Sequence, residues 1–328
     1  MSYHIAKCGE VIPMATRSTI SSRYKAITRA VNREFWNSTS ETSHSLYVGS
    51  YGRDTAIDTS DIDILLELPR SEYERYDYYR GNGQSRLLQA VKSAIQNSYP
   101  RTDVRADGQV VKLAFTDGMQ IEVLPAFSST DWYGKTTYQY PDTNMGGNWR
   151  STNPKAEQSA MRDKNTSSRG LLFDTCKHMR FIRDNYYSSY HLSGIVIDSF
   201  VYAAMGNWCW TENSSSSAVS DGKFEQALYN YYVNYLRYSS TIQAPGSNDS
   251  VDLRPKSNVN KTRAIITPTF SASTAGRNCI FAIQPNQLCT VPVKSRNSNV
   301  IIVKNKRAAT SLILRNISIR YFIMFIHS

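Results

Sequence analysis

The feature that most constrains the fold is an alternation of acidic and apolar residues near the start of the chain. Asp61 and Asp63 alternate with Ile62 and Ile64. Because successive side chains of a strand point to opposite faces, such a strand directs both carboxylates to one face and both isoleucines into a core. Two carboxylates at the start of a buried strand repel each other and lose solvation, a cost that a divalent cation offsets. The alternation therefore predicts a buried strand that carries a metal site.

A Gly-Ser pair stands 11 residues before Asp61. The run Ser45–Val48 predicts a short strand that ends at Gly49. Because glycine has no side chain, backbone N–H groups can approach an anion there, and the hydroxyl of Ser50 adds a donor. The pair predicts a phosphate-binding turn. It is not a Walker loop, since the lysine and the other glycines of that motif are absent.

A third carboxylate is expected on a neighbouring strand. In the run Met119–Leu124 the apolar residues alternate with polar ones and place Glu122 opposite the core side chains. Asp117-Gly118 precedes this run and predicts a hairpin with Val110–Phe115. Hard oxygen ligands suit magnesium, and in-line phosphoryl transfer uses two ions about 3.5–4 Å apart. We therefore expect two Mg²⁺ ions, with Mn²⁺ as an alternative, at Asp61, Asp63 and Glu122.

The remaining pattern predicts a mixed α/β lobe followed by a helical lobe. Helical periodicity occurs at 18–36 and 85–97 among strand signals, and again near 170–187, 193–208 and 221–238 where strand signals fade. Segments 141–169 and 211–222 are rich in Ser, Thr, Asn and Gly and are predicted as loops. The fold class is therefore α/β (α+β), with lobes at 1–145 and 146–253.

The net charge of +11 is concentrated at the end of the chain. Of 38 Lys/Arg and 27 Asp/Glu residues, 12 and one respectively lie in 251–328, so the first 250 residues carry 26 of each sign. A polyanion-binding surface is therefore expected only in the tail or in a local patch, and the first 250 residues as a whole are not expected to bind nucleic acid. For the tail, 254–328, two interpretations stay open: a basic appendage for nucleic acid or a protein partner, and a frameshift-like or lineage-specific extension without a packed role, which the erratic apolar pattern favours.

Targeting and metal-binding cysteine signals are weak. No apolar stretch approaches the roughly 20 residues of a membrane helix, and the N-terminus lacks the order of a secretory signal. The five cysteines are scattered without CxxC spacing, so neither a disulfide framework nor a zinc site is indicated. We expect a soluble, cytoplasmic protein that does not bind membranes.

The run GSYGRDTAIDTSDIDILL at 49–66, followed by IEVLPAF at 121–127, resembles the DNA polymerase β-like nucleotidyltransferases. It is most similar to their cyclic GMP-AMP synthase/DncV-like branch, which serves bacterial antiphage signalling. The likeness covers about residues 18–253. It implies a nucleotidyltransferase lobe with a mixed sheet, a helical lobe like that of the oligoadenylate synthases, and nucleotides bound in the cleft between them.

The resemblance also implies roles for individual residues. Asp61, Asp63 and Glu122 match the family's metal-binding acidic residues, although many relatives have the shorter aspartate in the third position. Gly49 and Ser50 match its phosphate-contacting pair.

Two further residues are matched in the second lobe. The segment Asp174–Arg180 resembles a family helix that offers a lysine to the triphosphate, and this role is carried to Lys177. Gly194 stands where many relatives have a serine that binds triphosphate, and the resemblance therefore assigns this contact to the neighbouring Ser193.

These features predict an enzyme that uses ATP, GTP or other nucleoside triphosphates to make a cyclic di- or trinucleotide, with a regulatory or effector protein of a defence operon as a possible partner. The first alternative is a linear oligonucleotide or RNA-end nucleotidyltransferase, which needs the same carboxylates. The second is a catalytically silent nucleotide-binding sensor or antitoxin. The presence of all three acidic residues argues against the second alternative.

Overall fold

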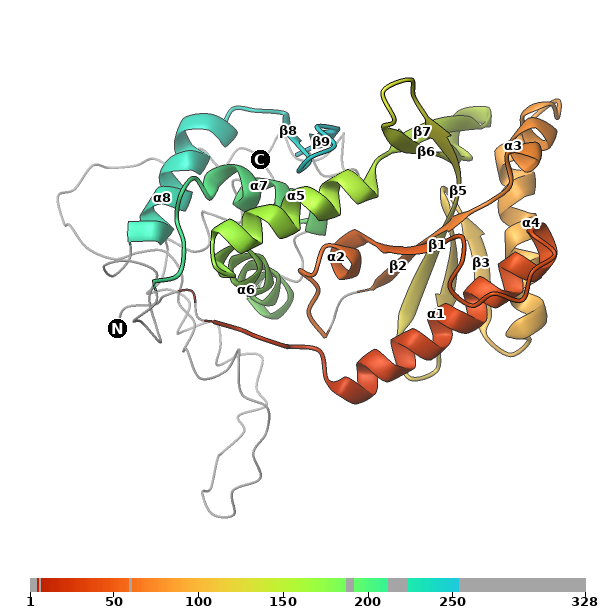
Figure 1. Ribbon diagram of the computed structural model, residues 1–328, viewed down its shortest axis with the longest axis horizontal. Helices are drawn as coiled ribbons and strands as arrows, with labels where there is room; N and C mark the ends of the chain where they lie inside the picture. The colour runs from red at the N-terminus through yellow and green to blue at the C-terminus, as the bar shows by residue number, and fades with distance from the viewer. Residues whose placement is uncertain (1–4, 6, 59–60, 187–191, 212–222, 254–328) are drawn as a thin grey trace, which may run out of the picture. The chain divides into compact units, whose positions relative to one another are not determined.

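The computed structural model describes residues 5, 7–58, 61–186, 192–211 and 223–253 (Figure 1). These residues form two compact units. The sheet unit contains Ile12–Arg162 and Pro245–Asp249, and the helical unit contains the described residues up to Val11, Asp163–Ala244 and those from Ser250 onward. The predictions for 254–328 and for nearly all of 211–222 lie outside the described residues. Within the described part, none of the helices combines the length and apolarity needed to cross a membrane.

The sheet unit is built on a seven-stranded mixed sheet. Its main path runs β1-β2-β5-β4-β3, with β6 paired to β5 and β7 paired to β6. Strands β2 and β5 are parallel and every other pair is antiparallel. The strands are β1 (Ser45–Val48), β2 (Ile62–Glu67), β3 (Asp103–Asp107), β4 (Val110–Ala114), β5 (Gln120–Thr130), β6 (Thr136–Asp142) and β7 (Asn148–Thr152).

Helices α1 (Met14–Phe35) and α4 (Gly83–Ser98) lie side by side against one face of this sheet (Figure 1). Their apolar positions recur at three- and four-residue intervals, which gives each helix one apolar face. These faces and the inward-pointing side chains of the sheet form one core, which includes Ile20, Ile27, Val31, Ile62, Ile64, Leu87, Val91, Ile95, Val111, Leu113, Ile121 and Val123. The short helix α3 (Arg70–Asp77) follows β2. The polar side chains that alternate with this core are therefore on the opposite face of the sheet.

The helical unit contains α6 (Leu171–Tyr186), α7 (Gly194–Ala204) and α8 (Lys223–Tyr231), and α8 continues into a π-helical turn, η2 (Tyr232–Leu236). Strands β8 (Thr241–Gln243) and β9 (Ser250–Asp252) form a small antiparallel pair. The described N-terminal residues pack on this unit. The backbone N–H of Ile5 donates to Glu225 at 3.0 Å, and that of Cys8 donates to Asp174 at 2.9 Å.

The predicted α+β fold is confirmed, and so are the strand at 45–48, the buried strand that carries Asp63 and the 110–124 hairpin. The prediction of a loop at 141–169 is wrong. This segment forms η1 (Asn144–Gly146), β7 and α5 (Pro154–Ser167). Asn153 accepts a hydrogen bond from the backbone N–H of Ala156 at 3.1 Å, and Pro154 stands where a missing N–H costs nothing. The two units divide inside α5, between Arg162 and Asp163, whereas the expected lobe boundary at 145/146 precedes that helix.

Candidate active site

The register of the sheet brings two of the predicted carboxylates together. Asp63 in β2 pairs directly with Glu122 in the parallel strand β5. Their neighbours Ile62, Ile64, Ile121 and Val123 are buried in the core under α1 and α4, so both carboxylates lie on the other face. Asp61 precedes β2 and is exposed. The structure thus makes Asp63 and Glu122 cross-strand neighbours and places Asp61 at the entry to the same strand.

The Gly-Ser pair is held against Asp63. Gly49 and Ser50 open the one-turn helix α2 (Gly49–Gly52), directly after β1, whose last residue, Val48, pairs with Asp63. Gly49 has a φ of +59°, which favours glycine, and a Cβ there would overlap the Asp63 carboxylate. The carbonyl of Ser50 accepts a hydrogen bond from the backbone N–H of Thr55 at 3.0 Å. The predicted phosphate-binding turn therefore packs directly on a predicted metal ligand.

The electrostatics of Asp63 reflect this crowding. Burial, followed by the negative charges of Glu122 and Asp61, raises the pKa of Asp63 to about 7, although the guanidinium of Arg53 acts in the opposite direction. A carboxylate in this position is costly to ionise without added positive charge. A divalent cation bound beside Asp63 would therefore favour the ionised form of this carboxyl group.

Sequence reasoning missed a basic residue beside Glu122. Lys112 in β4 is the register partner of Glu122. Its Nζ lies 3.3 Å from Oε1 of Glu122 and 3.0 Å from Oδ2 of Asp107, and the hydrogen bond to Asp107 raises the pKa of Lys112. This neighbour could have been predicted from the sequence. The turn at Asp117-Gly118 pairs Phe115 with Met119, and counting back along the two strands from that pair places residue 112 opposite residue 122.

The donors fit a hard divalent cation. Asp63 and Glu122 supply adjacent carboxylates, and the charge repulsion at Asp63 is of the kind that such an ion relieves. Among the described residues, no three or more His, Cys, Asp or Glu side chains are grouped so that they could hold a metal ion together. Magnesium needs fewer protein ligands than that, since one or two carboxylates plus water and phosphate oxygens complete its shell.

The two predicted residues of the helical unit lie on different elements. Lys177 is on α6, and its Nζ donates to the carbonyl oxygen of Gly9 at 2.9 Å. Ser193 is exposed and directly precedes α7. The two residues are thus carried by α6 and by the N-terminus of α7, both within the helical unit.

The structure explains why residue 194 is glycine in this chain. Arg180 is bound by Asp198 through two hydrogen bonds of 2.6 and 2.9 Å, and it also donates to the carbonyl oxygen of Gly194 at 2.9 Å. A Cβ at position 194 would lie 2.8 Å from a guanidinium nitrogen of Arg180. A serine at this position would therefore collide with the buried Arg180.

Comparisons with known proteins point to one family. Residues 6–165 match the family described as the Second Messenger Oligonucleotide or Dinucleotide Synthetase domain. No protein of curated function matches the sequence.

Solved structures share the fold. The Rhodothermus marinus CdnE c-UMP-AMP synthase with Apcpp and Upnpp is 14% identical with a TM-score of 0.50, and the match covers 76% of this chain and 86% of that one. The E. coli MS115-1 CdnC with ATP is 11% identical with a TM-score of 0.50, over 86% of this chain and 80% of that one. These matches confirm the predicted fold, and together with the family match over residues 6–165 they support the predicted resemblance to the cGAS/DncV-like nucleotidyltransferases.

Proposed function

We propose that this chain joins nucleoside triphosphates into a cyclic di- or trinucleotide and releases pyrophosphate at each step. The observation that carries the proposal is the pairing of Asp63 with Glu122 beside the Gly49-Ser50 turn. This arrangement combines two oxygen ligands for a cation with a turn that suits a phosphate, and it lies within a domain of the matched family. A triphosphate enzyme needs both features at one place.

The proposed roles follow from the positions of the residues. Asp63 and Glu122, with Asp61, would hold magnesium or manganese, which would supply positive charge to the triphosphate and to the attacking hydroxyl. Gly49 and Ser50 bind the triphosphate. The ribose oxygen forms a bond to the α-phosphorus, the bond from this phosphorus to the β-phosphate oxygen breaks, and the hydroxyl proton leaves on the Glu122 side. Positioning of the two nucleotides and the positive charge of the cations supply most of the rate acceleration.

Two lines of support favour a cyclic product. One structure with the same fold is described as a c-UMP-AMP synthase and holds two nucleotide analogues, and another, CdnC, holds ATP. The description of the matched family names the synthesis of second-messenger oligonucleotides or dinucleotides. We extend this to a role in antiphage signalling with a regulatory or effector protein as partner. Since its substrates would be cellular nucleoside triphosphates, we place the activity in the cytoplasm.

The direct test is product analysis. Purified full-length protein is incubated with the four nucleoside triphosphates and Mg²⁺ or Mn²⁺, treated with phosphatase and examined by mass spectrometry. A phosphatase-resistant product with the mass of a cyclic di- or trinucleotide is the expected result. Phosphatase-sensitive products would favour the linear alternative, and unconsumed triphosphates under all conditions would favour the catalytically silent alternative.

The variant Glu122→Gln tests the role of this carboxylate. Its turnover should fall more than its binding of the donor triphosphate does. An effect mainly on binding would remove Glu122 from the acceptor side.

A further inference from the structure

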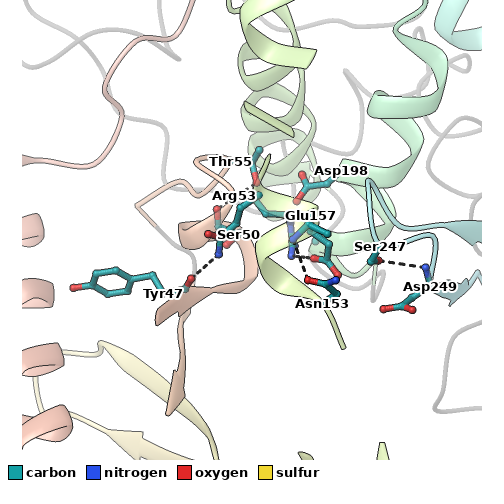
Figure 2. Close-up of polar contacts among 12 residues, drawn as sticks. Tyr47, Ser50, Arg53, Thr55, Asn153, Glu157, Asp198, Ser247 and Asp249 are labelled. Carbon is teal, nitrogen blue, oxygen red and sulfur yellow. Dashed lines mark hydrogen bonds and ion pairs between the residues drawn. The ribbon is translucent and has the colours of Figure 1, made fainter. Parts of the chain in front are cut away.

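A buried ion pair connects the turn after the Gly-Ser motif to helix α5. Nη1 of Arg53 lies 2.9 Å from Oε2 of Glu157 on α5 (Figure 2). Arg53 is 6% exposed and Glu157 is 7% exposed. The two residues are 104 positions apart, and both belong to the sheet unit. Because two charges removed from water bind strongly only in good geometry, such a pair fixes the relative position of the segments that carry it.

A second contact joins the same two segments. Nε2 of Gln158, the residue after Glu157, donates to the backbone carbonyl of Tyr47 at 2.7 Å. Gly52 lies so close to this carbonyl and to Gln158 that a Cβ would overlap both. Helix α5 therefore contacts the segment on both sides of the Gly-Ser pair: at Tyr47 before it, and at Gly52 and Arg53 after it.

The segment between these two contacts carries Gly49 and Ser50. Inside it, the backbone N–H of Arg53 donates to the carbonyl of Gly49 at 3.2 Å, and that of Thr55 donates to Ser50 at 3.0 Å. Gly49 packs on the carboxylate of Asp63. A shift of Arg53 would thus move the Gly-Ser pair relative to Asp63, whose own position is fixed by the pairing of β2 with β1 and β5.

We propose that Arg53 and Glu157 are positioning residues, and that their ion pair holds the Gly49-Ser50 turn at the place where it can bind a triphosphate. This inference rests on the proposed function and adds to it. Asp63 and Glu122 are held by strand pairing, whereas the turn is held by α5. Loss of the ion pair therefore impairs triphosphate binding and leaves the carboxylates in place.

The test uses the full-length protein and the variant Glu157→Gln, which keeps the shape of the side chain and removes its charge. The control is Glu72→Gln, which removes the carboxylate of the exposed Arg75–Glu72 pair in the same unit. Hydrogen–deuterium exchange of residues 49–56 is measured without nucleotide, and steady-state kinetics are measured with Mg²⁺ and the nucleoside triphosphates that the wild type consumes.

In Glu157→Gln we expect exchange in 49–56 to rise and the KM for the triphosphate to increase about tenfold, with kcat changed less than about twofold, since misplacing a binding group by a fraction of an ångström has effects of this size. The control should match the wild type. A folded Glu157→Gln with the exchange and KM of the control would overturn the proposal.

A second variant separates positioning from folding. Arg53→Met with Glu157→Met replaces the ion pair with apolar side chains, a change that commonly preserves stability. Because this variant also removes the Arg53 charge that acts on Asp63, exchange in 49–56 is the deciding measurement. A positioning pair predicts exchange that stays raised, whereas wild-type exchange together with a wild-type KM would overturn the proposal. Because the exchange experiment needs no substrate, a wild type that consumes no triphosphate would contradict the proposed function while the effect of Glu157 on the turn is still measured.

Discussion

The candidate metal ligands of the sheet unit and the candidate triphosphate-binding lysine of the helical unit are held in place by different means. In the sheet unit, backbone pairing of β2 with β5 sets Asp63 beside Glu122. In the helical unit, Lys177 is held by a single hydrogen bond to the carbonyl of Gly9, from a segment 168 residues away. The first arrangement is a property of the backbone ladder, and the second depends on a side-chain contact.

This difference determines what substitutions should do. A side chain on a central strand can be changed without moving its backbone, because the ladder hydrogen bonds are made by other atoms. Within the helical unit, α6 is joined to α7 by the ion pair of Arg180 with Asp198, which are 1% and 0% exposed, so a single substitution there can loosen the packing. We therefore expect substitutions of the carboxylates in the sheet unit to abolish activity and substitutions of buried charges in the helical unit to lower the free energy of unfolding.

The strongest test of this comparison is Asp61→Asn with Asp63→Asn. Loss of both charges should reduce triphosphate consumption by about a thousandfold, the upper range for removing a preorganised charge-stabilising group. The melting temperature should stay the same or rise, because position 63 no longer carries a buried carboxyl group whose ionisation near Glu122 is unfavourable. Pyrophosphate release and circular dichroism measure the two effects, with the exposed Asp103→Asn as control. Unchanged product formation in the double variant would remove these residues from the site.

The placement of Asp63 and Glu122 on one face of the sheet could be predicted from the sequence because the relevant patterns are local. The alternation at Asp61–Ile64 and the Asp117-Gly118 turn determine strand faces and hairpin register, and these place Glu122 on the same face as Asp63. Lys112 could have been predicted by the same reasoning. Helix α5 was missed because its exposed polar residues resemble a loop, although Asn153 and Pro154 form a helix-start signal.

Contacts between distant segments could not be predicted in this way. The pairing of Arg53 with Glu157 spans 104 residues, and that of Lys177 with Gly9 spans 168. Neither is signalled by periodicity or by a motif, since each depends on how complete elements pack. The same holds for Arg180, whose contact with Gly194 explains the glycine at that position.

The next largest effect is expected from Asp198→Asn in the helical unit. This change leaves the buried guanidinium of Arg180 without its charged partner, and it should lower the free energy of unfolding by about 3–5 kcal/mol. Urea unfolding followed by circular dichroism measures the loss. Replacing both residues, as Arg180→Met with Asp198→Leu, should recover most of it. Glu72→Gln, in an exposed pair, should cost less than about 1 kcal/mol. Equal losses in Asp198→Asn and Glu72→Gln would show that the buried pair is not a main stabiliser of this unit.

The helical unit should also be sensitive to acid through His178. Burial lowers the pKa of His178 from its usual range near 6.5 to about 4. Above pH 6.5 the imidazole is neutral in both the folded and the unfolded protein. As the pH falls from 6.5 to 4, the unfolded state takes up the proton first, so the folded state loses up to about 3 kcal/mol. Unfolding of wild type and His178→Phe between pH 7 and 4 tests this, because the other acid-sensitive groups cancel in the difference. Parallel pH curves for the two proteins would contradict it.

The smallest effect is expected from Lys177→Ala. The Lys177 ammonium has three donors, so its bond to Gly9 leaves two for phosphate oxygens. Because a single partly exposed cation contributes at most about 1 kcal/mol, the KM for the triphosphate should rise about fivefold at low salt, and less at 0.5 M salt where the charge is screened. Lys164→Ala is the matched control, since Nζ of Lys164 likewise donates to a glycine carbonyl, that of Gly206, at 2.6 Å within the helical unit. An unchanged KM for Lys177→Ala at low salt would remove this residue from triphosphate binding. An equal rise in both variants would mean that losing a lysine–carbonyl contact loosens the helical unit, and the charge of Lys177 would then have no special role.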